Sequence, residues 1–90
     1  NGTVYDADLN RMFGVEFDFK RATTIYAAYK TLFVILDRLA YEGVNQIDLA
    51  TNLPVFASEI ATRDDSKALG RTLVEKLKRY DMTVTNVKTI

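Results

Sequence analysis

Carboxylates are the side chains of this sequence best suited to acid–base chemistry or metal binding, and they occur in three close pairs. The pairs are Asp6 with Asp8, Glu16 with Asp18, and Asp64 with Asp65. Paired carboxylates can exchange protons with a substrate or bind Mg²⁺. A structural explanation is favoured here, because all three pairs stand at expected helix starts or alternate along an expected extended segment. Caps and solvent-exposed faces commonly use such residues.

The 90-residue chain contains no histidine and no cysteine. This composition removes the commonest general base, the thiolate nucleophile and the usual zinc ligands. The sequence also lacks a phosphate-binding loop, a nucleophile elbow and a dinucleotide fingerprint. A chain of this length has little room for both a core and a catalytic cleft. We therefore expect a non-enzymatic protein that uses no metal and no cofactor.

Basic residues concentrate in the last third of the chain. Residues 1–62 carry a net charge of −3 and residues 63–90 a net charge of +3, although the whole chain is neutral. Lys67, Arg71 and Lys78 fall near one side of an expected helix, and Arg63 lies in the preceding turn. Such a helix can enter a DNA major groove. An ordinary solvent-exposed helix face explains the same pattern.

The strongest element expected is a helix over residues 20–42. Its apolar residues recur at spacings of three and four, which is typical of one continuous helical stripe. The stripe consists of Ile25, Tyr29, Leu32, Leu36 and Leu39. Further apolar residues widen it, so we expect this helix to be the central element of the domain.

Shorter patterns predict the remaining elements. Asp6 and Gly14 are suited to begin and end a helix over residues 6–13. Pro54 suits the first turn of another helix, with Thr51 or Asn52 as its cap.

Residues 15–19 are expected to form a short strand or a loop, and residues 45–49 an extended segment or a helical turn. Helices are expected at about 53–62 and 66–80, and a strand at 82–90. That strand needs a partner for its backbone groups. The candidates are residues 15–19, residues 45–49 and a second copy of the chain.

These elements predict a mostly α fold with a small β element, an α+β domain of three to four helices spanning residues 1–90. The order of elements over residues 20–90 resembles the winged-helix family. That resemblance implies that helix 66–80 is a recognition helix. It also implies that Arg63, Lys67, Arg71 and Lys78 contact nucleic acid.

Protein binding is the first functional hypothesis, and DNA binding by a winged-helix-like domain is the alternative. Tyr26 and Tyr41 fall beside the main apolar stripe, and exposed tyrosines are frequent interface anchors. Gly70 interrupts helix 66–80, which indicates either a close approach by a partner or a crowded internal contact. Together with the charge asymmetry, these residues suggest an interaction or assembly module that self-associates.

The sequence contains no apolar stretch long enough to span a membrane and no signal peptide. We therefore expect a soluble protein, cytoplasmic by default, without a membrane partner. Because the sequence starts at Asn1, we also expect it to be a domain of a longer or processed chain.

Overall fold

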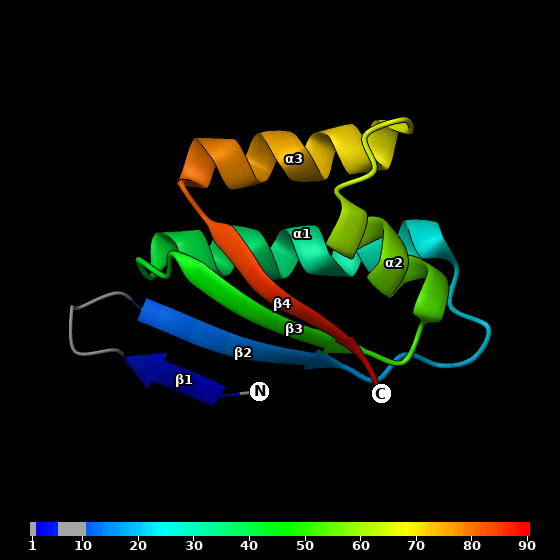
Figure 1. The fold of residues 1–90 in the computed structure, drawn as a ribbon, viewed down its shortest axis with the longest axis horizontal. Coiled ribbons are helices and arrows are strands. Elements are labelled where there is room, and N and C mark those ends of the chain that lie inside the picture. The colour runs from blue at the N-terminus through cyan, green and yellow to red at the C-terminus, as the bar shows by residue number, and fades with distance from the viewer. Residues whose placement is uncertain (1, 6–10) are drawn as a thin grey trace.

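The structure, a computed structural model, describes residues 2–5 and 11–90, and for residues 2–5 and 11 it describes the backbone alone. These residues form four strands and three helices in the order ββαβααβ (Figure 1). The strands are β1 Gly2–Tyr5, β2 Arg11–Phe17, β3 Gln46–Thr51 and β4 Thr83–Thr89. The helices are α1 Ile25–Tyr41, α2 Pro54–Thr62 and α3 Ala68–Tyr80.

A single sheet with the strand order β1-β2-β3-β4 organises the molecule. β1 runs antiparallel to β2, whereas β2, β3 and β4 are mutually parallel. Parallel neighbours require crossover connections, which α1 supplies between β2 and β3, and α2 with α3 between β3 and β4. Successive right-handed crossovers in one direction place their helices on the same face of a sheet. The three helices accordingly lie on one side of this sheet (Figure 1).

Alternation along β3 shows which face of the sheet is covered. Ile47, Leu49 and Thr51 are buried, and the residues between them are only partly buried. One side of α1 packs on this face through Ala28, Tyr29, Leu32, Phe33, Leu36 and Leu39. The core therefore lies between the sheet and α1, with α2 and α3 closing it from the same side.

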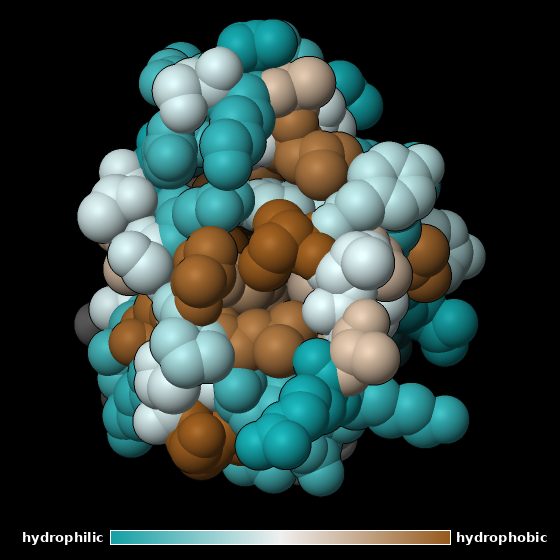
Figure 2. Space-filling model, turned by 90° about the vertical axis from the view of Figure 1, so that its right-hand side faces the viewer, coloured by the Kyte–Doolittle hydropathy of each residue, from teal (hydrophilic) through white to brown (hydrophobic). Residues whose placement is uncertain are grey.

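Aromatic rings close the core at the end where the three parallel strands finish. Phe17 and Phe19 stack with their ring centroids 5.3 Å apart, and Phe56 meets both Phe19 and Tyr29 edge to face. Figure 2 views this end, where apolar side chains gather near the centre and polar ones surround them.

The fold class expected from the sequence is wrong. A winged-helix domain places a strand hairpin after its helices, but here β4 pairs in parallel with β3, the strand that precedes α2 and α3. The β element is also a four-stranded sheet rather than a small accessory. Element order does not reveal strand pairing, because partners far apart in sequence are chosen by core packing.

The expected helix over residues 6–13 is wrong where the structure describes it, because residues 11–13 belong to β2; residues 6–10 lie outside the described part of the chain. The other expected helices lie near α1, α2 and α3. α1 begins at Ile25 because the Thr24 side chain caps it, accepting a hydrogen bond from Ala27 N at 3.1 Å. It ends before Gly43, whose φ of 81° suits glycine.

Candidate interface on helix α1

The outer side of α1 carries three exposed apolar or aromatic residues. Tyr26 is 60% exposed, Val34 69% and Tyr41 88%. At about 100° per residue, these three positions fall within roughly 80° of one another around the helix axis. They therefore form one strip, opposite the side that packs on the sheet. Scattered single apolar residues are normal on surfaces, but three aligned on one helix mark a candidate contact surface.

Charged side chains of both signs lie on the same strip. The ammonium of Lys30 sits 5.7 Å from the centre of the Tyr26 ring, a cation–π distance. One turn beyond Val34, Asp37 accepts hydrogen bonds at its Oδ1 from Lys76 Nζ, at 2.8 Å, and from the Tyr80 hydroxyl, at 2.5 Å. These two hydrogen bonds, chiefly that of Lys76, lower the pKa of Asp37. Asp37 is therefore anionic at neutral pH and still about half exposed.

The strip has a pseudo-symmetric order along the helix. Tyr26 and Tyr41 are equally distant in sequence from the midpoint between Phe33 and Val34, and so are Lys30 and Asp37. When two copies of α1 lie antiparallel about that midpoint, each Tyr26 meets the partner's Tyr41, and each Lys30 meets the partner's Asp37. Val34 then lies beside the two-fold axis. A strip ordered in this way is complementary to itself, as an isologous interface requires.

The four basic residues selected from the sequence lie in different environments. Arg63 ends α2 in a left-handed conformation with a φ of 51°. Lys67 precedes α3 and approaches Glu59 at 3.8 Å, and Arg71 donates to the backbone oxygens of Asp65 and Ser66 at 3.3 Å each. Arg63 and Lys78 line one depression together. Part of this set therefore stabilises the turn before α3 rather than forming a single basic face.

Gly70 is a crowded internal position. A Cβ added to it would stand 1.8 Å from the backbone oxygen of Asp64, in the turn that precedes the same helix. The glycine is buried, and the close neighbour is the chain's own backbone rather than a partner or α1. Of the predicted interface residues, Tyr26 and Tyr41 share the strip on α1, and Gly70 lies away from it.

One carboxylate of each described pair accepts structural hydrogen bonds. Asp64 accepts hydrogen bonds from the hydroxyl and the backbone N–H of Ser66, which lower its pKa. Asp18 accepts one from Asn52 Nδ2 at 3.0 Å. Asp6 and Asp8 lie outside the described residues. Over residues 11–90, no group of three or more carboxylates is close enough to hold a metal ion.

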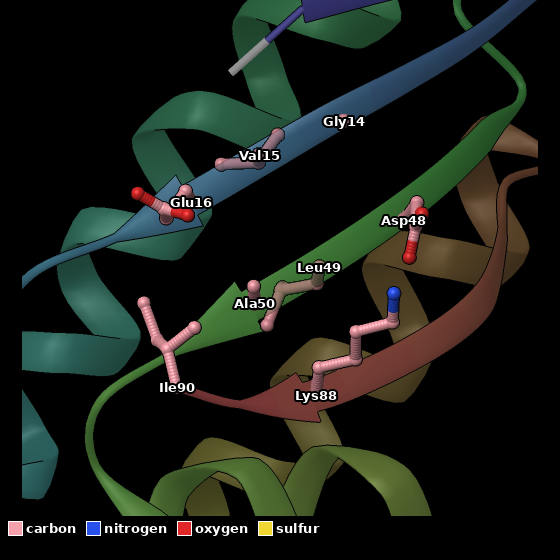
Figure 3. Close-up of a pocket in the computed structure, with 8 residues that line it drawn as sticks. All are labelled: Gly14, Val15, Glu16, Asp48, Leu49, Ala50, Lys88 and Ile90. Carbon is pink, nitrogen blue, oxygen red and sulfur yellow. The ribbon is translucent and has the colours of Figure 1, made fainter.

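Glu16, from the second of these pairs, and Asp48 line a shallow depression of about 350 Å³ on the open face of the sheet (Figure 3). Gly14 and Ala50 provide small residues beside them, and the Lys88 side chain points toward Asp48. The depression is wide and open to solvent, so it has no means of excluding water from a reaction. We do not assign chemistry to it.

Asn52 is a structural residue that sequence reasoning considered only as a helix cap. Its Nδ2 donates to Phe19 O at 2.7 Å, and its Oδ1 accepts from Phe19 N at 2.9 Å. It thereby fastens the loop after β2 to the end of β3. Thr51 Oγ1 accepts from Leu53 N at 3.2 Å in the turn before α2, and α2 itself has Leu53 as its N-cap, without a side-chain cap hydrogen bond. No local signal distinguishes these roles, because the partner of Asn52 lies 33 residues away.

No helix in the described part of the chain is both apolar enough and long enough to cross a membrane. Comparison with protein-family models, with curated protein sequences and with solved structures finds no match to this chain.

Proposed function

We propose that this chain is a protein–protein interaction module that self-associates through the outer side of α1. Two copies pair in antiparallel orientation, with Tyr26 against the partner's Tyr41 and Lys30 against the partner's Asp37. The observation that carries the proposal is the alignment of Tyr26, Val34 and Tyr41, each at least 60% exposed, on one strip of one helix. Tyrosines provide large contact areas at low conformational cost, which makes them effective interface anchors.

Charge complementarity supports a second copy as the partner. Lys30 and Asp37 are of opposite sign and lie at equal distances from the pseudo-symmetry midpoint, so antiparallel pairing brings each against its complement twice. Parallel pairing would instead place like charges level with one another. The Lys76 ammonium holds Asp37 in position at 2.8 Å, which reduces the conformational entropy lost when the dimer forms.

The size of the surface predicts weak association. α1 has 17 residues, and at 1.5 Å per residue it is about 25 Å long. One exposed strip on such a helix buries less than the roughly 800 Å² per partner of a standard stable interface. We therefore expect a reversible dimer in the micromolar to millimolar range, one suited to assembly in which several weak contacts act together.

Sedimentation velocity over a hundredfold range of concentration tests the proposal. The weight-average mass should rise above 10.2 kDa with concentration and approach twice that value. Val34→Glu should remain monomeric, because it places two carboxylates beside the two-fold axis.

A matched control is available on α2. Val55 is exposed to a similar extent, 60% against 69% for Val34, but lies away from the strip. Val55→Glu should therefore associate like the wild type. A wild-type chain that stays monomeric at every concentration, or a Val55→Glu variant that dissociates as Val34→Glu does, would rule out this interface.

A further inference from the structure

The outer edge of β4 is available for strand pairing. β4 is the last strand in the sheet order, so among the described strands it pairs only with β3. It contains no proline and one charged residue, Lys88, and most of its side chains are exposed. A strand edge of this kind presents backbone N–H and C=O groups that an additional strand can pair with.

The register of β4 shows which residues direct their backbone groups outward. Ile90 N donates to Thr51 O at 2.9 Å, so the backbone N–H of Ile90 points toward β3. Alternate residues of a strand direct their hydrogen-bonding groups to opposite edges, and pairing with β3 is regular from Asn86 onward. Val87 and Thr89 therefore direct their N–H and C=O groups away from the sheet.

A groove runs beside this edge. One depression of about 340 Å³ is lined by Ile60, Ala61 and Arg63 together with residues 84–87 of β4. A second depression, of about 260 Å³, has an apolar lining from Val74, Leu77 and Met82 and also includes Arg63 and Lys78. Arg63 lines both depressions, and the two together are called the groove below. Alternate side chains of a peptide strand paired with β4 could occupy these two depressions.

The groove carries positive charge at its centre. Arg63 and Lys78 are both exposed, and Asp81 is the one acidic residue in the lining of the two depressions. Arg63 holds its place in a left-handed conformation that glycine or asparagine would adopt at lower conformational cost. The charge complementary to this groove is a carboxylate, and a guanidinium binds carboxylates through paired hydrogen bonds.

We infer that β4 and the adjoining groove bind an acidic peptide in extended conformation, which adds to the sheet as a fifth strand. Val87 and Thr89 bond its backbone, and Arg63 with Lys78 bind one of its carboxylates. A peptide is favoured over nucleic acid because the free strand edge recognises a peptide backbone, which nucleic acid lacks. This site is separate from the strip on α1 and does not depend on self-association.

The probe is an eight-residue peptide of alternating valine and threonine in which two threonines are replaced by glutamate. Titration to 1 mM into the full ¹⁵N-labelled chain should shift the amide signals of Arg63 and of residues 85–89. The same peptide with glutamine in place of glutamate should bind about tenfold more weakly, because it lacks the charge-assisted hydrogen bonds. Arg63→Gln should weaken binding of the glutamate peptide equally, whereas Lys20→Gln, in the exposed loop before α1, should not.

Two further arms test the strand pairing itself. Val87→Pro removes one outward N–H and should abolish binding. Because Val87 also packs partly on the core, peptides N-methylated on one edge provide the same test without altering the protein. Methylation along the edge that faces β4 should abolish binding, and methylation along the opposite edge should not.

Absence of binding at 1 mM, or binding that is insensitive to methylation on either edge, would overturn the inference. Displacement of the peptide from Arg63 by a random duplex DNA of equal charge, without shifts along β4, would also overturn it in favour of nucleic acid. If Val87→Pro abolishes self-association of the chain, the edge of β4 pairs with a second copy rather than with a peptide, and the inference is wrong.

Discussion

Gly70 illustrates how one residue fixes the relation between a turn and the helix that follows it. Glycine inside a helix usually costs about 1 kcal/mol relative to alanine, so replacement by alanine ordinarily stabilises a helix. Here an added Cβ would stand 1.8 Å from Asp64 O. The backbone of residues 63–67 would have to move, and the Ser66–Asp64 hydrogen bonds lie within that segment.

Gly70→Ala should therefore lower the free energy of unfolding by about 1–3 kcal/mol, the range for forced overpacking. Urea denaturation measures this change. Glu75→Ala, at an exposed position of the same helix, should change stability by less than about 0.5 kcal/mol. A Gly70→Ala variant as stable as the wild type would show that the turn before α3 is not fixed by this contact.

Asn52 is a second single residue that stabilises a loop. Its side-chain amide hydrogen-bonds the backbone N–H and C=O of Phe19, in the loop after β2. Asn52→Ala removes three hydrogen bonds and leaves the backbone groups of Phe19 without this partner. Unfolding free energy should fall by about 2–3 kcal/mol. The free energy of unfolding of Asn52→Asp should lie between those of Asn52→Ala and the wild type, because the new carboxylate can still accept a hydrogen bond from Phe19 N. If thermal denaturation finds Asn52→Ala as stable as the wild type, the side chain of Asn52 does not stabilise the loop after β2.

At the scale of elements, Asp37 connects α1 to α3. Its contacts with Lys76 and Tyr80 lower its pKa below the usual value near 3.8. A carboxylate whose pKa is lowered by folding stabilises the folded state above its unfolded pKa, and this contribution is lost as the pH falls through the folded pKa. The Asp37–Lys76 contact should therefore contribute at neutral pH and vanish in acid.

Asp37→Asn should cost about 0.5–1 kcal/mol at pH 7, the range for a partly exposed ion pair. The difference from the wild type should shrink toward zero as the pH falls through the lowered pKa of Asp37. Urea denaturation at pH 7, 5 and 3 measures it, with Glu75→Gln, exposed on α3, as a control for loss of charge alone. A difference that does not change with pH would contradict the ion pair.

The positions of the helices are largely predictable from this sequence, but the pairing of the strands is not. The spacing of Tyr29, Leu32, Leu36 and Leu39 reflects contacts within one helix face, and that face is the buried side of α1. The expected strand at 82–90 likewise overlaps β4. In contrast, Gly14 suggested a helix end but lies inside β2, where it pairs with Asp48, 34 residues later. Pairing between residues so far apart produces no local sequence pattern from which it could be predicted.

The candidate interface was only partly predictable for a similar reason. Tyr26 and Tyr41 stand outside the apolar stripe in sequence, and both are exposed in the structure. Val34 is flanked by Phe33 and Ile35, so composition alone does not separate it from the core. Its exposure follows from its angular position on α1, which becomes informative once the buried side of that helix is known.

For the whole molecule, the parallel arrangement of β2, β3 and β4 determines which surfaces are free. All three helices cover one face of the sheet, so one side of α1 faces solvent, and β4 is left at the edge. The two surfaces use different chemistry, side chains on α1 and backbone groups on β4. Because they lie on different elements, the proposed pairing and the proposed peptide binding do not compete for one surface.

Paramagnetic relaxation across the dimer measures whether two copies of α1 pair in antiparallel orientation. An unlabelled Glu42→Cys chain, whose engineered thiol is the only one because the native sequence has no cysteine, carries a nitroxide label and is mixed with a ¹⁵N-labelled wild-type chain. If the two helices pair antiparallel, amides of residues 24–30, at the start of the partner's α1, should lose intensity in proportion to dimer formation, while those of residues 38–43 should be less affected. Broadening centred on residues 38–43, or no broadening along α1 at millimolar concentration, would contradict antiparallel pairing.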